Sequence, residues 1–154
     1  MDTLLFECKD MINGEKFPVK NTGRGQDLSP EFLINNLSPS AKTLAITLED
    51  ITHPLFKDFT HWLIWNLPPD KRINGAIPHG KTVPNSGNAR QGIGYGLYRY
   101  AGPKPPKGKR HLYRFTVYVL NDNIDLKFPH TKNHFFRKAR KHIIQQGSIV
   151  CEFE

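Results

Sequence analysis

Three segments of this chain have the pattern of strands that are apolar on both faces. In residues 114–120 (RFTVYVL), a phenylalanine and two valines share one face, while threonine, tyrosine and leucine share the other. Residues 61–67 (HWLIWNL) and 43–49 (TLAITLE) have the same character. A strand that is apolar on both faces belongs in the middle of a sheet or between two layers. The chain is therefore predicted to fold around a buried β-sheet.

Each of these strands has an ionisable residue at one end. Asp50 follows the segment 43–49, whereas His61 and His111 stand at the start of the other two. A lone histidine beside an apolar strand is more often a structural residue with satisfied hydrogen bonds than a ligand-binding one. Three such residues at the ends of three buried strands favour a common site. We therefore take Asp50, His61 and His111 as candidate site residues.

The segment just before His111 is rich in proline and glycine. Prolines cannot donate hydrogen bonds to a sheet, and glycines permit turn geometries that are closed to other residues. Residues 102–110 (GPKPPKGKR) are therefore predicted to form an ordered loop that places its neighbours accurately.

The composition favours a mainly β fold. A chain of 154 residues fits one domain, covering 1–154, and it contains twelve prolines and twelve glycines. One clear helical pattern is present, at 132–146, and Gly147 is expected to end it. The long segment 71–101 lacks a strong period and is predicted to be extended loop that wraps the sheet.

The order and spacing of these blocks resemble the phosphatidylethanolamine-binding protein family, in its compact bacterial and archaeal branch often called Raf-kinase-inhibitor-like. The matching blocks are SPEF, LAITLEDITHP, HWLIWNLP and YRYAGPKPPKGKRHLYRFTVYVLN. The resemblance implies a β-sandwich-like fold with a large central antiparallel sheet, a smaller sheet, and a helix near 132–146 followed by a terminal strand. It also implies a homodimer.

Site residues of the family carry over where its motifs are present. The DPDxP block of the family begins at Asp50, and Thr52 replaces its second aspartate. The GxHRY block falls on His111 to Tyr113, with Leu112 in place of the arginine. With the proline-rich wall included, the predicted ligand-binding residues are Asp50, His61, His111, Tyr113, Gly102, Pro103, Pro105 and Pro106.

The resemblance implies a small pocket for a phosphate, a phosphoryl headgroup or a carboxylate. Protonated imidazoles can donate hydrogen bonds to such anions near neutral pH, and Asp50 can orient a histidine or meet a ligand ammonium. With Thr52 in place of a carboxylate, the pocket is expected to be less selective for an ammonium-bearing headgroup. The expected function is anion binding, with regulation of a kinase or protease partner, no catalytic residues and no cofactor.

Two other classes of function stay open. Asp50, His61 and His111 could form a two-histidine, one-carboxylate metal site, which would indicate a metal-dependent hydrolase. The net charge of +8, with tyrosines interleaved with arginines between residues 95 and 113, is compatible with nucleic-acid binding. No recognised nucleic-acid motif is present, so no specific nucleic-acid partner is predicted. The basic face of the predicted helix is more often simply solvated.

The two cysteines, Cys8 and Cys151, lie near opposite ends of the chain without the spacing of metal ligands. Both are predicted to face the core, and whether they pair stays open. The apolar run at the start of the chain is too short for a signal peptide or a membrane span. A cytoplasmic location and a chain without transmembrane segments are therefore expected.

Overall fold

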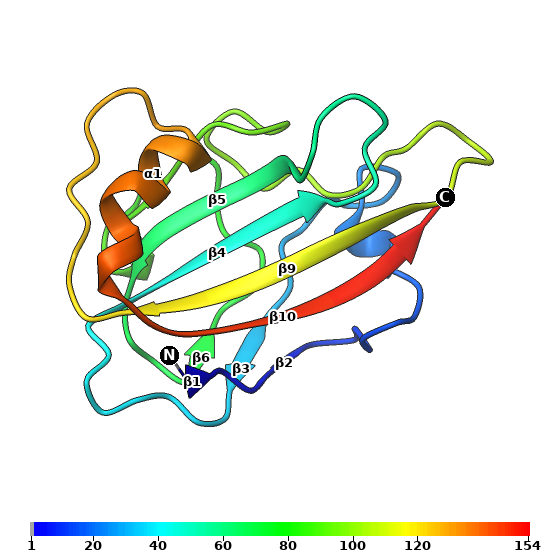
Figure 1. The fold of residues 1–154 in the computed structure, drawn as a ribbon. Coiled ribbons are helices and arrows are strands. Elements are labelled where there is room, and N and C mark those ends of the chain that lie inside the picture. Colours follow the sequence, from blue (N-terminus) through cyan, green and yellow to red (C-terminus); the bar gives the residue numbers. More distant parts are fainter. Residues whose placement is uncertain (1) are drawn as a thin grey trace.

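Two β-sheets form the body of the protein in a computed structural model that describes residues 2–154 (Figure 1). The larger sheet has seven strands in the order β1 (Asp2–Thr3), β10 (Ile143–Phe153), β9 (His111–Leu120), β4 (Thr43–Asp50), β5 (Phe59–Leu67), β8 (Ala89–Gln91) and β7 (Thr82–Val83). The smaller sheet has the order β2 (Phe6–Cys8), β3 (Phe32–Ile34) and β6 (Arg72–Ile73). The predicted mainly β fold is confirmed, with one difference: β1 pairs with β10 in parallel, so the large sheet is mixed.

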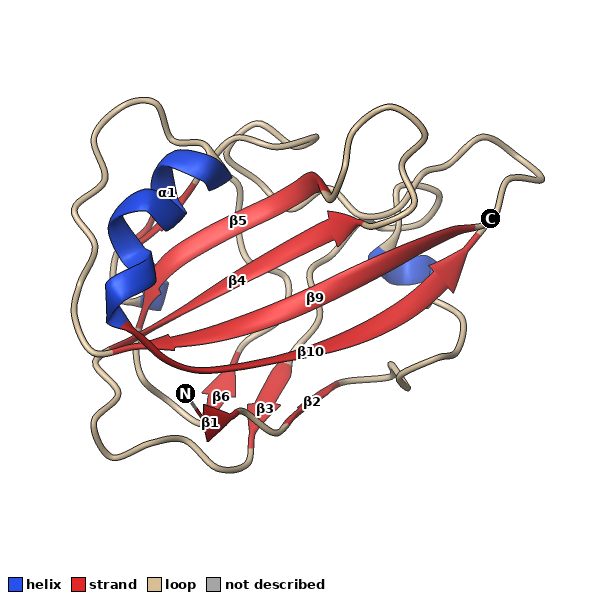
Figure 2. Ribbon diagram, in the orientation of Figure 1, coloured by secondary structure: helices blue, strands red, loops and turns tan. Residues whose placement is uncertain are grey.

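The three strands predicted to be buried, β9, β4 and β5, are adjacent in the middle of the large sheet. One face of this sheet packs against the small sheet, and the other face packs against α1 (Lys132–Ala139) (Figures 1 and 2). Phe115 and Val117 of β9 point into the first core, while Leu120 points into the second. The apolar character of both faces therefore follows from two separate hydrophobic cores.

The alternation predicted for β5 fails at its end. Leu67 packs in the same core as Trp62, on the face opposite to Trp65. The cause is Asn66, which adopts a left-handed conformation with φ of 59°. Its side-chain amide donates to the carbonyl of Ile124 at 2.9 Å and accepts from the Ile124 amide at 2.8 Å. This pair of bonds holds the inverted residue and returns the next side chain to the first core.

The predicted helix at 132–146 is too long. Helix α1 ends at Ala139, a short 3₁₀ turn, η3 (Arg140–His142), follows, and β10 begins at Ile143. The Gln145 side chain accepts a hydrogen bond from the Ser38 amide at 2.8 Å, and the backbone of this segment pairs with β9. Gly147 lies inside β10 and does not end the helix. No helix within residues 2–154 is long and apolar enough to cross a membrane.

The segment 71–101 is mostly irregular, as predicted, but it also contains the short strands β6, β7 and β8 and a 3₁₀ turn, η2 (Pro84–Ser86). Another 3₁₀ turn, η1 (Val19–Asn21), lies between the first strands of the small sheet. Because β6 joins the small sheet and β8 pairs with β5, this segment ties the two sheets together.

Both cysteines are buried, as predicted, and both are free thiols. Cys8 lies in the small sheet, where its sulfur is 3.6 Å from that of Met11, and Cys151 lies in β10, where its thiol contacts the Ile12 carbonyl at 3.4 Å. Burial raises the pKa of both thiols, so they remain protonated at neutral pH.

Candidate functional site

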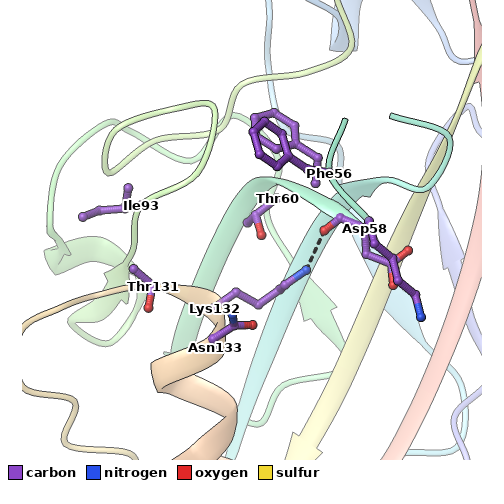
Figure 3. A pocket seen from close by; sticks show the side chains of 9 residues that line it. Phe56, Asp58, Thr60, Ile93, Thr131, Lys132 and Asn133 are labelled. Atoms are coloured by element: carbon purple, nitrogen blue, oxygen red, sulfur yellow. Dashed lines mark hydrogen bonds between the residues drawn. The ribbon is translucent and has the colours of Figure 1, made fainter. Parts of the chain in front are cut away.

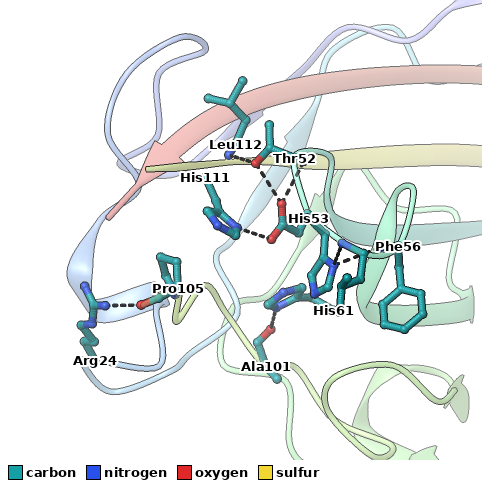
Figure 4. Close-up of polar contacts among 11 residues, drawn as sticks. Arg24, Thr52, His53, Phe56, His61, Ala101, Pro105, His111 and Leu112 are labelled. Carbon is teal, nitrogen blue, oxygen red and sulfur yellow. Dashed lines mark hydrogen bonds and ion pairs between the residues drawn. The ribbon is translucent and has the colours of Figure 1, made fainter. Parts of the chain in front are cut away.

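The structure brings Asp50, His61 and His111 to one end of the large sheet (Figure 4). Asp50 is the last residue of β4, His111 is the first residue of β9, and His61 lies near the start of β5. Strands β5 and β9 both run antiparallel to β4 and flank it on its two sides. The end of β4 therefore meets the beginnings of both neighbours, which is why three residues far apart in sequence share one region.

Asp50 holds His111 in a fixed orientation. Nδ1 of His111 donates to a carboxylate oxygen of Asp50 at 2.6 Å. The other oxygen accepts from the amide and the hydroxyl of Thr52, at 2.9 and 3.1 Å. Asp50 is 2% exposed, so these donors compensate for the water that its charge has lost. A carboxylate only accepts hydrogen bonds, so Nδ1 of His111 carries the proton and its Nε2 remains available to a ligand.

His61 is held in the same way, but by a neutral group. Its Nδ1 donates to the carbonyl oxygen of Ala101 at 2.9 Å, and the residue is 4% exposed. Burial lowers the pKa of His61, an effect that the Ala101 carbonyl and the nearby charge of Asp50 oppose. Because Nδ1 carries the proton, the second nitrogen, Nε2, accepts a hydrogen bond when the ring is neutral and donates one when it is protonated.

Tyr113 joins the two histidines. Its ring centroid lies 5.4 Å from that of His61, in an edge-on arrangement, and 6.3 Å from that of His111, in a stacked one. Burial and the charge of Asp50 raise the pKa of Tyr113, so its hydroxyl keeps the proton. Both imidazoles thus pack on one aromatic ring, which fixes their separation.

The proline-rich wall lies beside His61 and is tied to the rest of the fold. Gly102 follows Ala101, whose carbonyl accepts the hydrogen bond from His61, and the Gly102 amide donates to Asp27 at 2.7 Å. A Cβ atom at Gly102 would lie 2.1 Å from the carbonyl oxygen of Asn21, so the close approach requires glycine. Arg24 donates to the carbonyl of Pro105 (Figure 4). Of the four predicted wall residues, Gly102, Pro103 and Pro105 are buried, whereas Pro106 is exposed.

Two aromatic side chains and one further histidine near His61 were missed by the sequence analysis. Tyr95 lies with its ring 5.0 Å from His61, and Phe59 lies 5.6 Å from the same imidazole and 4.6 Å from that of His53. Nδ1 of His53 accepts the amides of Leu55 and Phe56, both at 3.1 Å. The proton of a neutral His53 is therefore on Nε2, which makes this ring a hydrogen-bond donor.

One signal in the sequence could have indicated Tyr95. It stands between Gly94 and Gly96, and a Cβ atom at Gly94 would lie 2.9 Å from the carbonyl of Thr60. The Tyr95 amide donates to that same carbonyl at 2.8 Å. The glycines therefore allow the loop to pack against the start of β5, beside His61. His53, in turn, lies inside the block that begins at Asp50.

A separate cavity of about 290 Å³ lies between the β4–β5 loop and the start of α1 (Figure 3). Two lysines, Lys57 and Lys132, line it. Lys132 donates to the carbonyl of Asp58 at 2.7 Å and forms an ion pair with the buried Glu49, which also binds Arg114 at 3.0 Å. Phe59 lines this cavity and also contacts His61.

The proposed metal site has no ligand set in the structure. Within residues 2–154 there is no group of three or more histidine, cysteine or acidic side chains that could hold a metal ion. Asp50, His61 and His111 lie at the same end of the sheet, where Asp50 and the carbonyl of Ala101 bind the Nδ1 atoms of the two rings and leave both Nε2 atoms for a ligand.

Comparisons with known proteins identify the family of the chain. A family profile described as phosphatidylethanolamine-binding protein matches residues 8–154. A UPF0098 protein of Pyrococcus abyssi is 38% identical over 144 residues, which is 92% of this chain and 80% of the relative. The UPF0098 protein YbhB of Escherichia coli is 30% identical over 124 residues, which is 76% of this chain and 78% of the relative. The chain belongs to the phosphatidylethanolamine-binding protein family.

Two solved structures have the same fold. A phosphatidylethanolamine-binding protein homologue of Chlamydia trachomatis, CT736, superposes with a TM-score of 0.84 at 23% identity, over 100% of this chain and 99% of that one. YbcL of Escherichia coli, described as a member of the mammalian family, gives a TM-score of 0.85 at 22% identity, over 98% of each chain. At these identities the likeness concerns the fold.

Proposed function

We propose that this protein binds a small anion, namely a phosphate, a phosphoryl headgroup or a carboxylate, between His61 and His111. The observation that carries the proposal is that each of the two imidazoles is held through Nδ1 at the same end of the sheet. Each ring is fixed through Nδ1 by a protein acceptor and packs on Tyr113, so each has its Nε2 left for a ligand. The membership of the family supports a binding module of this type.

The protonation of His61 links anion binding to pH. Burial lowers the pKa of this residue, so in the free protein its Nε2 is an acceptor near neutral pH. A fully ionised anion needs a donor there, and its negative charge raises the pKa of His61 in the complex. The complex therefore binds one proton more than the free protein, and the affinity rises as the pH falls through the pKa of the complex toward that of the free protein.

We expect sulfate to bind with uptake of about one proton, and to bind more tightly at about pH 6 than at about pH 8. Sulfate is the sharpest probe because it does not titrate in this range, so any proton that is taken up comes to the protein. Calorimetry in buffers of different ionisation enthalpy measures the uptake directly.

A matched pair of variants tests the assignment to His61. His61→Asn should remove most of the proton uptake, whereas His79→Asn, at an exposed histidine outside the pocket, should leave it unchanged. Sulfate affinity that stays flat between the two pH values, or uptake that persists in His61→Asn, would contradict the proposed link.

Thr52 affects how tightly the pocket binds a ligand that carries an ammonium group. Its hydroxyl donates to Asp50 at 3.1 Å and accepts from the Leu112 amide at 3.0 Å, so it connects the end of β4 to β9. It adds no charge to the pocket. Leu112, where the family motif has an arginine, adds none either. With Asp50 as its carboxylate and Thr52 beside it, the pocket discriminates weakly between phosphate and phosphoethanolamine.

We expect Thr52→Asp to increase the preference for phosphoethanolamine over phosphate by about fivefold, since a partly exposed ion pair contributes about 1 kcal/mol. Thr52→Ala is the control and should leave the ratio of the two affinities unchanged. Calorimetric titration of both ligands gives the ratio. A wild-type protein that already binds phosphoethanolamine far more tightly than phosphate would disprove the role assigned to Thr52.

Regulation of a kinase or protease partner stays a prediction of the family resemblance. The pocket itself does not define the surface that such a partner would contact, so the proposed function is limited to capture of the anion.

A further inference from the structure

A strongly basic surface lies on the side of the large sheet that carries α1. Residues 127–142 contain no acidic residue, while they include six lysines and arginines and three histidines. Among residues 2–154, Lys132 is the one member of this run that forms an ion pair. The others that remain without an acidic partner are Lys127, Arg137, Lys138, Arg140 and Lys141.

The cations form a continuous surface that extends beyond the helix. His134, Arg137, Lys138 and Lys141 line a shallow groove of about 340 Å³. From His134 the basic side chains continue past His130 to Lys81 and Arg90 of the β7–β8 hairpin. Partial burial lowers the pKa of His130, and the charges of Arg90, Lys81 and His134 lower it further, so His130 is neutral at neutral pH between charged neighbours. We call this surface the basic tract and define it by Lys81, Arg90, His130, His134, Arg137, Lys138 and Lys141.

Aromatic rings lie within the basic tract. Phe128 is 77% exposed, and its ring centroid lies 6.1 Å from that of His130 in an edge-on arrangement. The Tyr98 hydroxyl is 3.3 Å from Nδ1 of His130, and the ammonium of Lys81 lies 4.9 Å from the centre of the Tyr98 ring. The surface therefore combines unpaired cations with an exposed aromatic face.

We propose that the basic tract binds single-stranded nucleic acid without sequence specificity. Lysines and arginines along such a surface follow the phosphates, and exposed aromatic rings stack on bases, which every base permits. Phe128 supplies the stacking face, and the groove along α1 supplies the cations for the backbone.

An anionic membrane is the other class of partner that a basic helix fits, but the packing of α1 disfavours it. A helix that binds in the membrane interface inserts an apolar face. In α1 that face is buried, because Phe135 and Ala139 are 0% exposed and pack against Trp65 and its neighbours. Phe128, beside the tract, is then the exposed aromatic side chain that could enter a bilayer.

The part of the basic tract toward the end of α1, Arg137, Lys138 and Lys141, lies away from the anion pocket. Helix α1 leads through η3 to Ile143, which pairs with Leu120 at the end of β9. His111 lies at the opposite end of that strand (Figure 1). The two surfaces can therefore be tested by separate substitutions.

The test measures the anisotropy of a fluorescent oligothymidylate of about 12 nucleotides, a length within the range of known single-strand sites, over a series of salt concentrations. The triple variant Arg137→Gln, Lys138→Gln, Lys141→Gln should bind at least about tenfold more weakly at low salt, and its salt slope should be smaller by about 2, because each phosphate contact contributes about 0.7. Phe128→Ala should weaken binding about tenfold and leave the slope unchanged.

The matched control neutralises three exposed lysines elsewhere, in the variant Lys9→Gln, Lys16→Gln, Lys71→Gln. It should keep most of the affinity and the salt slope. Equal losses in both triple variants would show a general charge effect and overturn the proposal. It is also overturned if vesicles of phosphatidylserine and phosphatidylcholine, but not the oligonucleotide, bind through the tract. Thermal melts of each variant show whether it is folded.

Discussion

Replacing both His61 and His111 with alanine is expected to abolish anion binding. Each imidazole supplies a charge-assisted hydrogen bond, and such bonds contribute about 1.5–3 kcal/mol each. Loss of both should therefore lower the affinity for sulfate or phosphate by at least about 100-fold. Calorimetry at about pH 6, where the proposed binding is tighter than at about pH 8, gives the largest range for this measurement.

Two further variants make this result interpretable. His61 is buried and Asp50 loses a partner, so the double alanine variant is expected to be less stable. His61→Asn with His111→Asn keeps a side chain that can donate at both positions and should also fail to bind. Lys107→Gln with Lys109→Gln, at exposed positions of the loop before β9, should chiefly alter the salt dependence. Full affinity in a folded double-histidine variant would remove the site.

The central sheet could be predicted because strands that are apolar on both faces fit few positions. β4, β5 and β9 are covered on one side by the small sheet and on the other by α1. Apolar residues on both faces of these strands therefore indicate that a layer packs on each face. The inversion at Asn66 was not predictable. It depends on hydrogen bonds to Ile124, a residue 58 positions away, and no local pattern records that contact.

The end of the helix illustrates a second limit. Ile143 stands four residues after Ala139 and therefore continues the apolar stripe of α1, but it is equally suited to a strand. The segment forms a strand because it pairs with β9 and because Gln145 makes hydrogen bonds to Ser38 and Asn36. The local hydrophobic pattern does not indicate these long-range hydrogen bonds.

The candidate site was predictable where its chemistry lies at the ends of strands. Asp50, His61 and His111 have that position, and antiparallel pairing brings them together. His53 and Tyr95 were missed because each reaches the site through a loop, where position depends on packing. The ion pair of Lys132 with Glu49 was missed for the same reason, since the two residues are 83 positions apart. Sequence patterns identify the strands, whereas loop geometry decides which side chains join them.

Phe115→Ala is expected to lower the free energy of unfolding by about 3–5 kcal/mol, the usual cost of removing a buried phenylalanine from a core. Phe115 is 1% exposed, and its ring packs edge-on against Phe32 of the small sheet at 5.3 Å and in a tilted arrangement against Phe17 at 5.8 Å. It therefore joins the two sheets, and a cavity there cannot be filled by a local shift.

Phe128→Ala removes the same atoms from a side chain that is 77% exposed, so it should change the free energy of unfolding by no more than about 0.5 kcal/mol. Urea denaturation of both variants measures the difference. Phe17 also packs on Tyr113, at 6.1 Å. The cavity left by Phe115→Ala is therefore separated by the Phe17 ring alone from Tyr113, on which both histidines pack. Anion affinity should then fall in Phe115→Ala and stay unchanged in Phe128→Ala. Equal stability of the two variants would show that the contact between the sheets is not the main core, and the rigid placement of His61 and His111 would then need another cause.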